Sequence, residues 1–249
     1  MRIAIAGGNG TVGRWATAAA ADRGHEVLVL SRRTGHDLET GDGLAPALVG
    51  VDALIDVTSL SSTSKKRSVE FFEKVTRNLL DAETASGVGH YIALSIVGID
   101  DIDASYYGGK LAQERAVTGG DVPWSILRAA QFHEFAEQVL VRGAVGPLAA
   151  VPTALIRPVA AREVGARLVD IAETGPAGRT RDLVGPEDER LIDLVRRMLA
   201  HDGVKRPTIE ITLPGLYWKA IASGVLRGTP GADQGSITFD EWLDLDHRP

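Results

Sequence analysis

A glycine-spaced turn between the first strand and the first helix constrains the fold of this chain more than any other feature. Residues 3–6 form a short apolar run that predicts a buried strand, and the alanine-rich segment 11–23 predicts a helix. Gly7, Gly10 and Gly13 lie at the junction of the two. The first glycine allows a tight turn, the second lets a ligand approach the backbone, and the third lets the helix pack closely on the strand.

This turn predicts a binding site for a dinucleotide. The free N–H groups and the positive dipole end of the helix would face the pyrophosphate. With 28 glycines in the chain, the spacing alone carries little weight, so the prediction depends on its position between a strand and a helix. The alternative is a strand–helix turn without a ligand. Six residues of the turn are expected to contact the cofactor: Gly7, Asn9, Gly10, Thr11, Val12 and Gly13.

The end of the second predicted strand indicates which dinucleotide is bound. Residues 26–30 are followed by Ser31, Arg32 and Arg33, where an NAD site normally has Asp or Glu for the ribose 2′-hydroxyl. Arginine fits a 2′-phosphate, which a carboxylate would repel, so the sequence favours NADP(H) over NAD(H). The alternative is two solvated surface arginines. Four further residues are expected beside the adenine or its ribose: Asp37, Leu38, Thr58 and Ser59.

Strand and helix signals alternate through the first half of the chain. Predicted strands cover residues 53–57, 91–95 and 124–128, and predicted helices cover 65–86 and 106–118. Repeated strand–helix units joined by short loops predict an α/β fold with a doubly wound parallel sheet and right-handed crossovers.

The second half is less regular, and we expect it to complete the sheet and add a cap. Residues 143–160 are rich in Gly and Pro and predict loops. We predict a single domain over 1–249, with a nucleotide-binding core over 1–186 and a small substrate-side cap over 187–249 that does not fold alone. Further elements are expected as helices at 162–173, 188–200 and 216–226, strands at 180–184 and 208–213, and a Gly-rich loop at 228–235.

Composition excludes several classes of protein. The chain has no cysteine, which excludes disulfide scaffolds, thiol nucleophiles, Cys-ligated zinc and iron–sulfur sites. A net charge of −6 gives no attraction to nucleic acid or an anionic membrane, and no apolar run approaches the roughly 20 residues of a membrane span. We therefore expect a soluble cytoplasmic protein. No metal site is expected, because no ligand spacing occurs among the six histidines: His25, His36, His90, His133, His201 and His247.

Three polar residues predict carbonyl chemistry near the expected nicotinamide. Tyr106 and Lys110 are four residues apart and so share a helix face, and Ser95 ends a strand at the carboxyl edge of the sheet, where ligands bind. A neighbouring ammonium favours ionisation of the phenol, which must donate a proton during carbonyl reduction. The alternative is a chance spacing, in which Tyr106 or the adjacent Tyr107 only packs.

The chain resembles the short-chain dehydrogenase/reductase family, in its atypical NmrA-like branch of NAD(P)H-binding proteins. The resemblance rests on residues 7–13, on the strand 91–95 and on Tyr106-x-x-x-Lys110, and it covers about residues 1–186. It implies a sheet of order 3-2-1-4-5-6-7, with a stunted third strand near residues 36–38. It also implies Ser95 as carbonyl polariser, Tyr106 as acid/base and Lys110 as ribose anchor. Three residues of the segment 127–132 are expected to line the nicotinamide: Ala129, Gln131 and Phe132.

Two functions follow from these features and stay open at this point. One is an enzyme, an NADP(H)-dependent oxidoreductase acting on a small carbonyl, alcohol or quinone substrate. The other is a non-catalytic NAD(P)H sensor of the NmrA-like type, which would bind a protein partner. The sequence names neither the substrate nor the oligomeric state, so a homo-oligomer stays open.

Overall fold

The computed structural model describes residues 1–245, apart from the side chain of Val145, and the chain divides into two compact units. The predicted cap, as far as residue 245, lies within unit 2. That unit also includes two earlier stretches of the chain. Unit 1 comprises Met1–Ser95, Asp103–Arg128 and Arg162–Arg181; unit 2 comprises Ile96–Ile102, Ala129–Ala161 and Asp182–Pro249.

Unit 1 is built on a sheet in the order β2-β1-β3-β4-β5, with β9 also paired to β5. The pairs β1–β2, β1–β3, β3–β4 and β5–β9 are parallel, with Ile3 opposite both Val27 and Ala53. The predicted parallel α/β sheet is therefore confirmed. Its strands are β1 (Arg2–Ala6), β2 (Glu26–Leu30), β3 (Ala53–Asp56), β4 (Tyr91–Ile96), β5 (Trp124–Ala129) and β9 (Gly178–Arg179).

The predicted third strand near residues 36–38 is wrong. A short helical turn, η1 (Arg32–Thr34), is followed by turns through Gly35, Gly41 and Gly43, whose φ angles are 87°, 78° and 74°. These left-handed conformations interrupt the run of extended residues that a strand needs. The sheet therefore starts at β2, and the rest of the predicted strand order holds.

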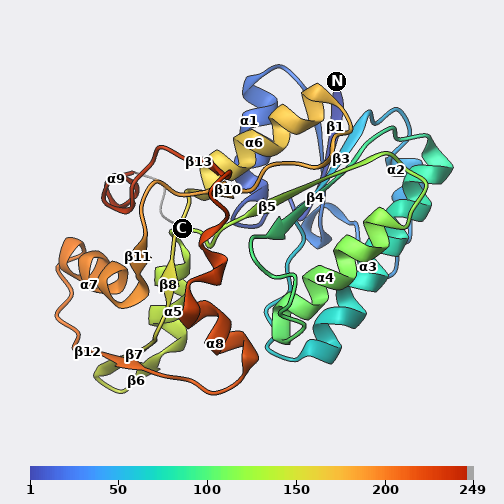
Figure 1. Cartoon of the computed structure of the whole chain (residues 1–249). Helices are drawn as coiled ribbons and strands as arrows, with labels where there is room; N and C mark the ends of the chain where they lie inside the picture. Colours follow the sequence, from blue (N-terminus) through green and yellow to red (C-terminus); the bar gives the residue numbers. More distant parts are fainter. Residues whose placement is uncertain (246–249) are drawn as a thin grey trace. The chain divides into compact units, whose positions relative to one another are not determined.

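Helices cover both faces of this sheet, with α1 and α6 on one side and α3 and α4 on the other (Figure 1). The predicted helix 65–86 is confirmed at both ends. It is capped at its start by the Ser64 hydroxyl, which accepts from the Arg67 N–H, and it ends at Gly87 with φ 80°. The helices are α1 (Gly13–Asp22), α2 (Leu44–Ala47), α3 (Lys65–Ser86), α4 (Ser105–Thr118) and α6 (Ala161–Thr174).

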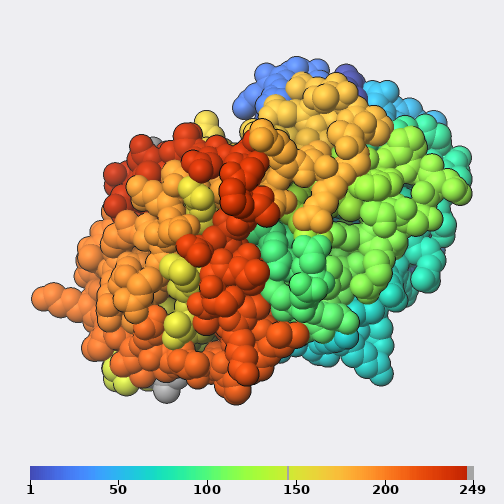
Figure 2. Space-filling view, in the orientation of Figure 1, coloured from blue at the N-terminus to red at the C-terminus, as the bar shows by residue number. Residues whose placement is uncertain are grey.

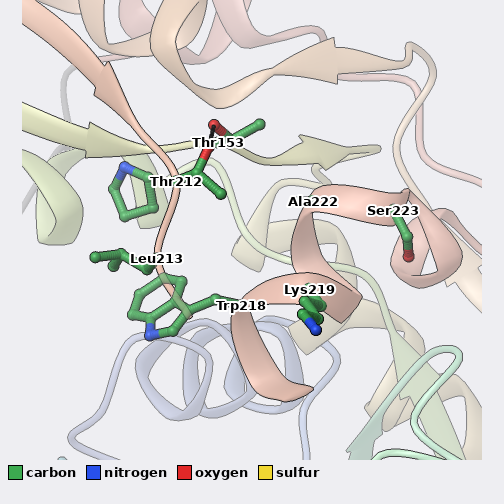
Figure 3. Close-up of a pocket in the computed structure, with 8 residues that line it drawn as sticks. Thr153, Thr212, Leu213, Trp218, Lys219, Ala222 and Ser223 are labelled. Carbon is green, nitrogen blue, oxygen red and sulfur yellow. Dashed lines mark hydrogen bonds between the residues drawn. The ribbon is translucent and has the colours of Figure 1, made fainter. Parts of the chain in front are cut away.

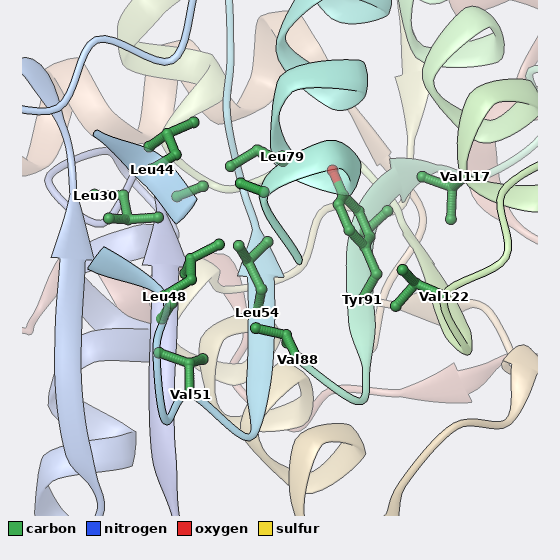
Figure 4. Packing of buried hydrophobic residues seen from close by; sticks show 14 of the residues in the cluster. Leu30, Leu44, Leu48, Val51, Leu54, Leu79, Val88, Tyr91, Val117 and Val122 are labelled. Carbon is green, nitrogen blue, oxygen red and sulfur yellow. The ribbon is translucent and has the colours of Figure 1, made fainter. Parts of the chain in front are cut away.

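A hydrophobic cluster lies under α2 and α3, where apolar side chains from the sheet meet those of the helices (Figure 4). Leu30, Leu54, Leu79 and Tyr91 are completely buried in it. Full burial of such side chains stabilises a fold by roughly 1.5–3 kcal/mol each. The cluster thus fixes the strands whose carboxyl ends carry the predicted site.

Glycines set how closely α4 approaches α3. The pair Gly108 and Gly109 is unfavourable in an isolated helix, yet both residues lie inside α4. A Cβ atom at Gly109 would lie 2.7 Å from Phe72 Cδ2 and 2.8 Å from Ser68 Cβ. Close packing of the two helices therefore explains the glycines.

A glycine also allows two helices to pack closely on the other face of the sheet, between α1 and α6. A Cβ atom at Gly165 would lie 2.6 Å from the backbone nitrogen of Ala16 and 2.8 Å from Trp15 Cβ. In the space-filling view, the segment 161–181 (yellow-orange) lies directly against the N-terminal residues (blue) (Figure 2). The helix that follows the glycine turn is thereby held in place.

Unit 2 contains short strands and helices. Leu183 of β10 pairs with Ala129 at the end of β5, and Val184 pairs with Gln234 of β13, both in parallel. β13 lies inside the segment 228–235 that was predicted as a loop. The strands are β6 (Ala144–Val145), β7 (Leu148–Pro152), β8 (Leu155–Ile156), β10 (Leu183–Val184), β11 (Glu189–Arg190), β12 (Thr208–Ile211) and β13 (Asp233–Gln234). The helices are α5 (Phe135–Arg142), α7 (Leu191–His201), α8 (Leu216–Ser223), η2 (Val225–Arg227) and α9 (Phe239–Leu243).

Within residues 1–245, no helix combines the length and apolar character that crossing a membrane would require.

Candidate functional site

The glycine turn has the compact geometry that its spacing predicts. Gly7 has φ 81°, and a Cβ atom there would lie 3.0 Å from the Val57 carbonyl oxygen. A Cβ at Gly13 would overlap the Gly7 carbonyl oxygen and lie 2.6 Å from Gly8 Cα. The Gly10 N–H donates to the Gly7 carbonyl oxygen at 2.9 Å. The turn therefore needs glycine at positions 7 and 13 for steric reasons.

The turn also offers unpaired donors at the start of α1. The backbone N–H groups of Thr11, Val12 and Gly13 donate to no acceptor among the described residues, and α1 has no side-chain cap at Val12. Such N–H groups at a helix N-terminus bind phosphate oxygens. These residues fit the pyrophosphate of a dinucleotide.

The segment after β2 is tied to the glycine turn. The Asn9 amide donates to the Ser31 hydroxyl at 2.7 Å, and the Thr34 hydroxyl closes η1 against the Ser31 carbonyl at 2.9 Å. Arg32 and Arg33 are exposed, and neither makes an ion pair within residues 1–245. Two guanidinium groups are thus available to an anion beside the turn.

The remaining residues predicted near the adenine have mixed environments. Asp37 is exposed and accepts the Glu39 N–H at 2.9 Å, while Leu38 is half-buried and its carbonyl accepts from Asn78 at 2.9 Å. Thr58 follows β3, where its N–H donates to Asp56 Oδ1 at 2.9 Å. The Thr58 hydroxyl is buried without a hydrogen-bond partner in the described part of the chain.

Ser95 lies at the carboxyl end of β4, as predicted, but its hydroxyl is enclosed. The residue is 2% exposed, and its Oγ has no hydrogen-bond partner among residues 1–245. Accordingly, no hydrogen bond joins it to Tyr106 or Lys110.

Tyr106 has the accessible phenol of the adjacent pair. Tyr107 is buried, whereas Tyr106 is half-buried and its hydroxyl lies 3.2 Å from the Ser59 hydroxyl. The Tyr106 ring meets the edge of the Phe72 ring at 5.5 Å, which fixes its direction. The structure therefore pairs Tyr106 with Ser59, a residue that the sequence assigned to the adenine ribose.

Lys110 is buried one turn further along α4. Its ammonium donates to the Gln113 side-chain oxygen and lies 4.6 Å from the centre of the Phe72 ring. Burial lowers the pKa of Lys110 to about 8, although the nearby Asp56 and Glu114 carboxylates counteract part of this effect. The buried cation therefore lies between the Phe72 ring and a polar cluster that begins at Gln113.

Asp56 is at the centre of this polar cluster, and sequence reasoning missed it. Its Oδ2 accepts from the Tyr91 hydroxyl at 2.6 Å and from the Gln113 amide at 2.7 Å. Gln113 thus bridges Lys110 and Asp56. The signal was a carboxylate inside the apolar strand 53–57, since an unpaired buried charge is too costly to occur without partners.

Glu83 on α3 is a second carboxyl that the sequence did not single out. It is completely buried, and both of its carboxyl oxygens are without hydrogen-bond partners in the described residues. Burial, together with the charge of Asp56, raises the pKa of Glu83 to about 9. Burial therefore favours the neutral form of Glu83, whereas the Asp56 carboxylate accepts hydrogen bonds from Tyr91 and Gln113.

The residues predicted to line the nicotinamide after β5 belong to unit 2. Ala129 is buried and pairs with Leu183. The Gln131 carbonyl accepts the Val159 N–H at 2.9 Å, and Phe132 forms a bridge with Val159. Gln131 Oε1 is buried without a partner among the described residues.

His133 packs in the interior of unit 2. Its Nε2 lies 3.0 Å from the Ile237 carbonyl oxygen, and its ring is 5.6 Å from Phe239 and 5.8 Å from Trp242. Burial lowers its pKa to about 4.

Residues 1–245 contain no group of three or more potential metal ligands, and His247 lies outside the described residues.

A pocket of about 280 Å³ opens in unit 2 between the strand β12 region and α8 (Figure 3). The Thr153 and Thr212 hydroxyls face each other at 3.5 Å on one side of it. None of the predicted site residues lines it. Its walls are formed by Pro152, Thr153, Thr212, Leu213, Trp218, Lys219, Ala222 and Ser223.

Two relatives share part of the sequence. The chain is 30% identical over 113 residues to the photosystem II assembly factor Ycf39 of Synechocystis sp., an alignment covering 39% of this chain and 34% of that protein. It is 26% identical over 153 residues to Ycf39 of Trieres chinensis, covering 54% of this chain and 47% of that protein. The chain thus spans less than half the length of either relative.

Solved structures share the fold. A short-chain dehydrogenase/reductase superfamily protein from Agrobacterium tumefaciens with bound NAD has a TM-score of 0.70 and 20% identity, covering 98% of this chain and 95% of that chain. The UDP-glucose 4-epimerase of Thermotoga maritima has a TM-score of 0.76 and 13% identity, covering 98% and 96%. A family model described as NAD(P)H-binding matches residues 7–149, more than half of the chain, from the glycine turn through Tyr106 and Lys110. The chain therefore belongs to the NAD(P)H-binding family.

Proposed function

We propose that this protein is an NADP(H)-dependent oxidoreductase that interconverts a small carbonyl or quinone substrate and its alcohol or hydroquinone. The observation that carries the proposal is the accessible phenol of Tyr106, on the same helix as the buried cation of Lys110 and hydrogen-bonded to Ser59. A phenol that can give up a proton beside a bound nicotinamide is what carbonyl reduction requires. We also propose that the chain belongs to the atypical NmrA-like branch of NAD(P)H-binding proteins.

Each residue has a defined task in this reaction. The glycine turn and the N–H groups of residues 11–13 would hold the pyrophosphate, and NADPH, when bound, would supply the hydride. Tyr106 gives its phenolic proton to the substrate oxygen during reduction and takes it back during oxidation. Lys110 favours the phenolate form through its charge. Gln113 accepts a hydrogen bond from the Lys110 ammonium and donates one to Asp56, and these bonds hold the ammonium in position.

Arg32 and Arg33 support a preference for NADP(H). Both are exposed and without ion pairs within residues 1–245, next to the Asn9–Ser31 hydrogen bond that ties their segment to the glycine turn. We expect NADPH to bind more tightly than NADH, and Arg32→Glu to reverse the order because it repels the 2′-phosphate. Nicotinamide fluorescence titrations measure both affinities. Equal affinities in the wild type would refute the preference.

A turnover assay tests the reaction itself. NADPH oxidation is followed at 340 nm with 9,10-phenanthrenequinone as the acceptor. We expect turnover in the wild type and a loss of roughly 100-fold in Tyr106→Phe, with NADPH affinity unchanged. Undiminished turnover in Tyr106→Phe would remove this residue from the reaction.

A non-catalytic NAD(P)H sensor is the second candidate. It is favoured by the enclosed Ser95 hydroxyl and by the relatives, which are named as assembly factors. It predicts tight NADPH binding without quinone reduction, which the same two assays distinguish. In either case we propose a cytoplasmic location, and the net charge of −6 offers no attraction to nucleic acid.

A further inference from the structure

We propose that Ser59, in place of Ser95, is the hydroxyl that acts beside Tyr106 on the substrate oxygen. This assignment rests on the proposed function and deepens it by naming the second polar group of the site. It reassigns Ser59, which the sequence placed at the adenine ribose, and it leaves Ser95 as a packing residue of β4.

The two serines differ in what they can reach. Ser59 is exposed, and its Oγ lies 3.2 Å from the Tyr106 hydroxyl. Ser95 is 2% exposed, and its Oγ is sealed from solvent without a hydrogen-bond partner in the described residues. Of these two serine hydroxyls, that of Ser59 is therefore the one that a substrate oxygen at the Tyr106 hydroxyl can also reach.

The pairing of Ser59 with Tyr106 is one of three ties between the same two segments. The Ser105 hydroxyl donates to the Thr63 carbonyl at 3.0 Å, and the Lys65 ammonium pairs with Asp103 at 2.8 Å. Residues 59–65, between β3 and the start of α3, are thus joined to residues 103–106 at the start of α4. The contact between the Ser59 and Tyr106 hydroxyls is therefore part of a junction made by three contacts between these segments.

Backbone strain lies at this junction. Ser105 has φ 50°, and it is the one residue other than glycine with a positive φ among residues 1–245. It immediately precedes Tyr106. A left-handed conformation is strained for a non-glycine residue and persists only where the surroundings enforce it, most often at functional sites. Here the hydrogen bond to Thr63 enforces it and directs the Tyr106 phenol toward Ser59.

The reduction balances with these groups. The carbonyl carbon gains the hydride supplied by NADPH, and the π-electron pair of the C=O bond moves to the oxygen. The Tyr106 O–H bond breaks and its proton forms the new O–H bond of the alcohol, after which solvent reprotonates the phenolate. Ser59 donates a hydrogen bond to the same oxygen as its charge develops, and it gains and loses no proton. The products are the alcohol and NADP⁺.

Two matched variants, Ser59→Ala and Ser95→Ala, test the assignment because each removes one hydroxyl. We expect kcat for NADPH-dependent reduction of 9,10-phenanthrenequinone to fall about 100-fold in Ser59→Ala, as for loss of an oxyanion donor, and to stay within threefold of wild type in Ser95→Ala. NADPH affinity should be unchanged in both. Ser59→Thr, which retains the hydroxyl, should restore most of the rate. With 13Cζ-labelled tyrosine, the Tyr106 resonance, assigned by its loss in Tyr106→Phe, should move in Ser59→Ala alone.

The outcomes separate this assignment from the proposed function. Turnover in the wild type with an unimpaired Ser59→Ala variant, or with the loss in Ser95→Ala instead, overturns the assignment and leaves the function standing. An unmoved Tyr106 resonance in Ser59→Ala also overturns it. A wild type that binds NADPH but reduces no quinone overturns the proposed reaction, and the role of Ser59 falls with it.

Discussion

Replacing Glu83 by glutamine is predicted to stabilise this protein at neutral pH. Glu83 is completely buried on α3, and its two carboxyl oxygens have no hydrogen-bond partner within residues 1–245. Its pKa is raised from 4.5 to about 9, first by burial and second by the charge of Asp56. The folded protein therefore retains a proton on Glu83 at pH 7 that the unfolded chain has lost.

The sign and size of the effect follow from proton linkage. Between pH 4.5 and about 9 the folded state binds one more proton at Glu83 than the unfolded state, so the free energy of unfolding falls as the pH rises. The loss is about 1.4 kcal/mol per pH unit and reaches about 3 kcal/mol at pH 7. Since Glu83 stays protonated in the fold at pH 7, that value depends only on its pKa in the unfolded chain.

Glutamine has the shape of the protonated acid and carries no charge in either state. Glu83→Gln should therefore match the wild type near pH 4.5 and exceed it by about 3 kcal/mol at pH 7. Urea unfolding at several pH values measures the difference. The matched control is Glu73→Gln, an exposed position on the same helix, which should show no such growth with pH.

A difference between Glu83→Gln and the wild type that does not change with pH would refute the reasoning. So would a Glu83→Gln variant that is less stable than the wild type at pH 7. A difference that does not change with pH would mean that Glu83 ionises in the fold at the same pH as in the unfolded chain.

Two further changes test the site from its two ends. Gly13→Ala should abolish NADPH binding because its Cβ would overlap the Gly7 carbonyl oxygen, whereas Gly89→Ala, whose Cβ would meet only the Asp52 carbonyl at 3.8 Å, should bind normally in the same fluorescence titration. Gln113→Met removes the bridge between the buried Lys110 ammonium and the buried Asp56 carboxylate. Because Lys110 is the expected ribose anchor, we expect NADPH binding to weaken about tenfold and the melting temperature to fall. Unchanged affinity in Gln113→Met would contradict a role for that bridge.

The sequence predicts the core of the fold because its signals there are local. The glycine turn, the strand 91–95 and the helix 65–86 each follow from spacing and apolar pattern within one segment, and all three are found. The strand predicted near 36–38 fails because glycines at positive φ interrupt it, a property that a resemblance to other chains does not carry over. β13 escaped prediction because a strand of two residues has no periodicity to detect.

The site was predictable in its residue types but not in its partners. The spacing of Tyr106 and Lys110 indicates a shared helix face, and both lie in α4. That Tyr106 meets Ser59 depends on a strained Ser105 and on contacts across about forty residues of chain, none of which leaves a local pattern. The bridge from Lys110 to Asp56 likewise joins separate elements, although the carboxylate in an apolar strand was a signal for it.

The energetics of Lys110 favour a role in chemistry over a role in stability. Lowering its pKa from 10.5 to about 8 corresponds to a cost of about 3 kcal/mol to keep it charged in the fold. A buried ion pair seldom returns such a cost, and an apolar residue of similar size would pack against Phe72 without it. The Asp56 carboxylate, joined to the cation through Gln113, and the Glu114 carboxylate offset only part of this cost. A buried charge maintained at this cost, one helical turn from the half-buried Tyr106, is typical of a site that moves protons.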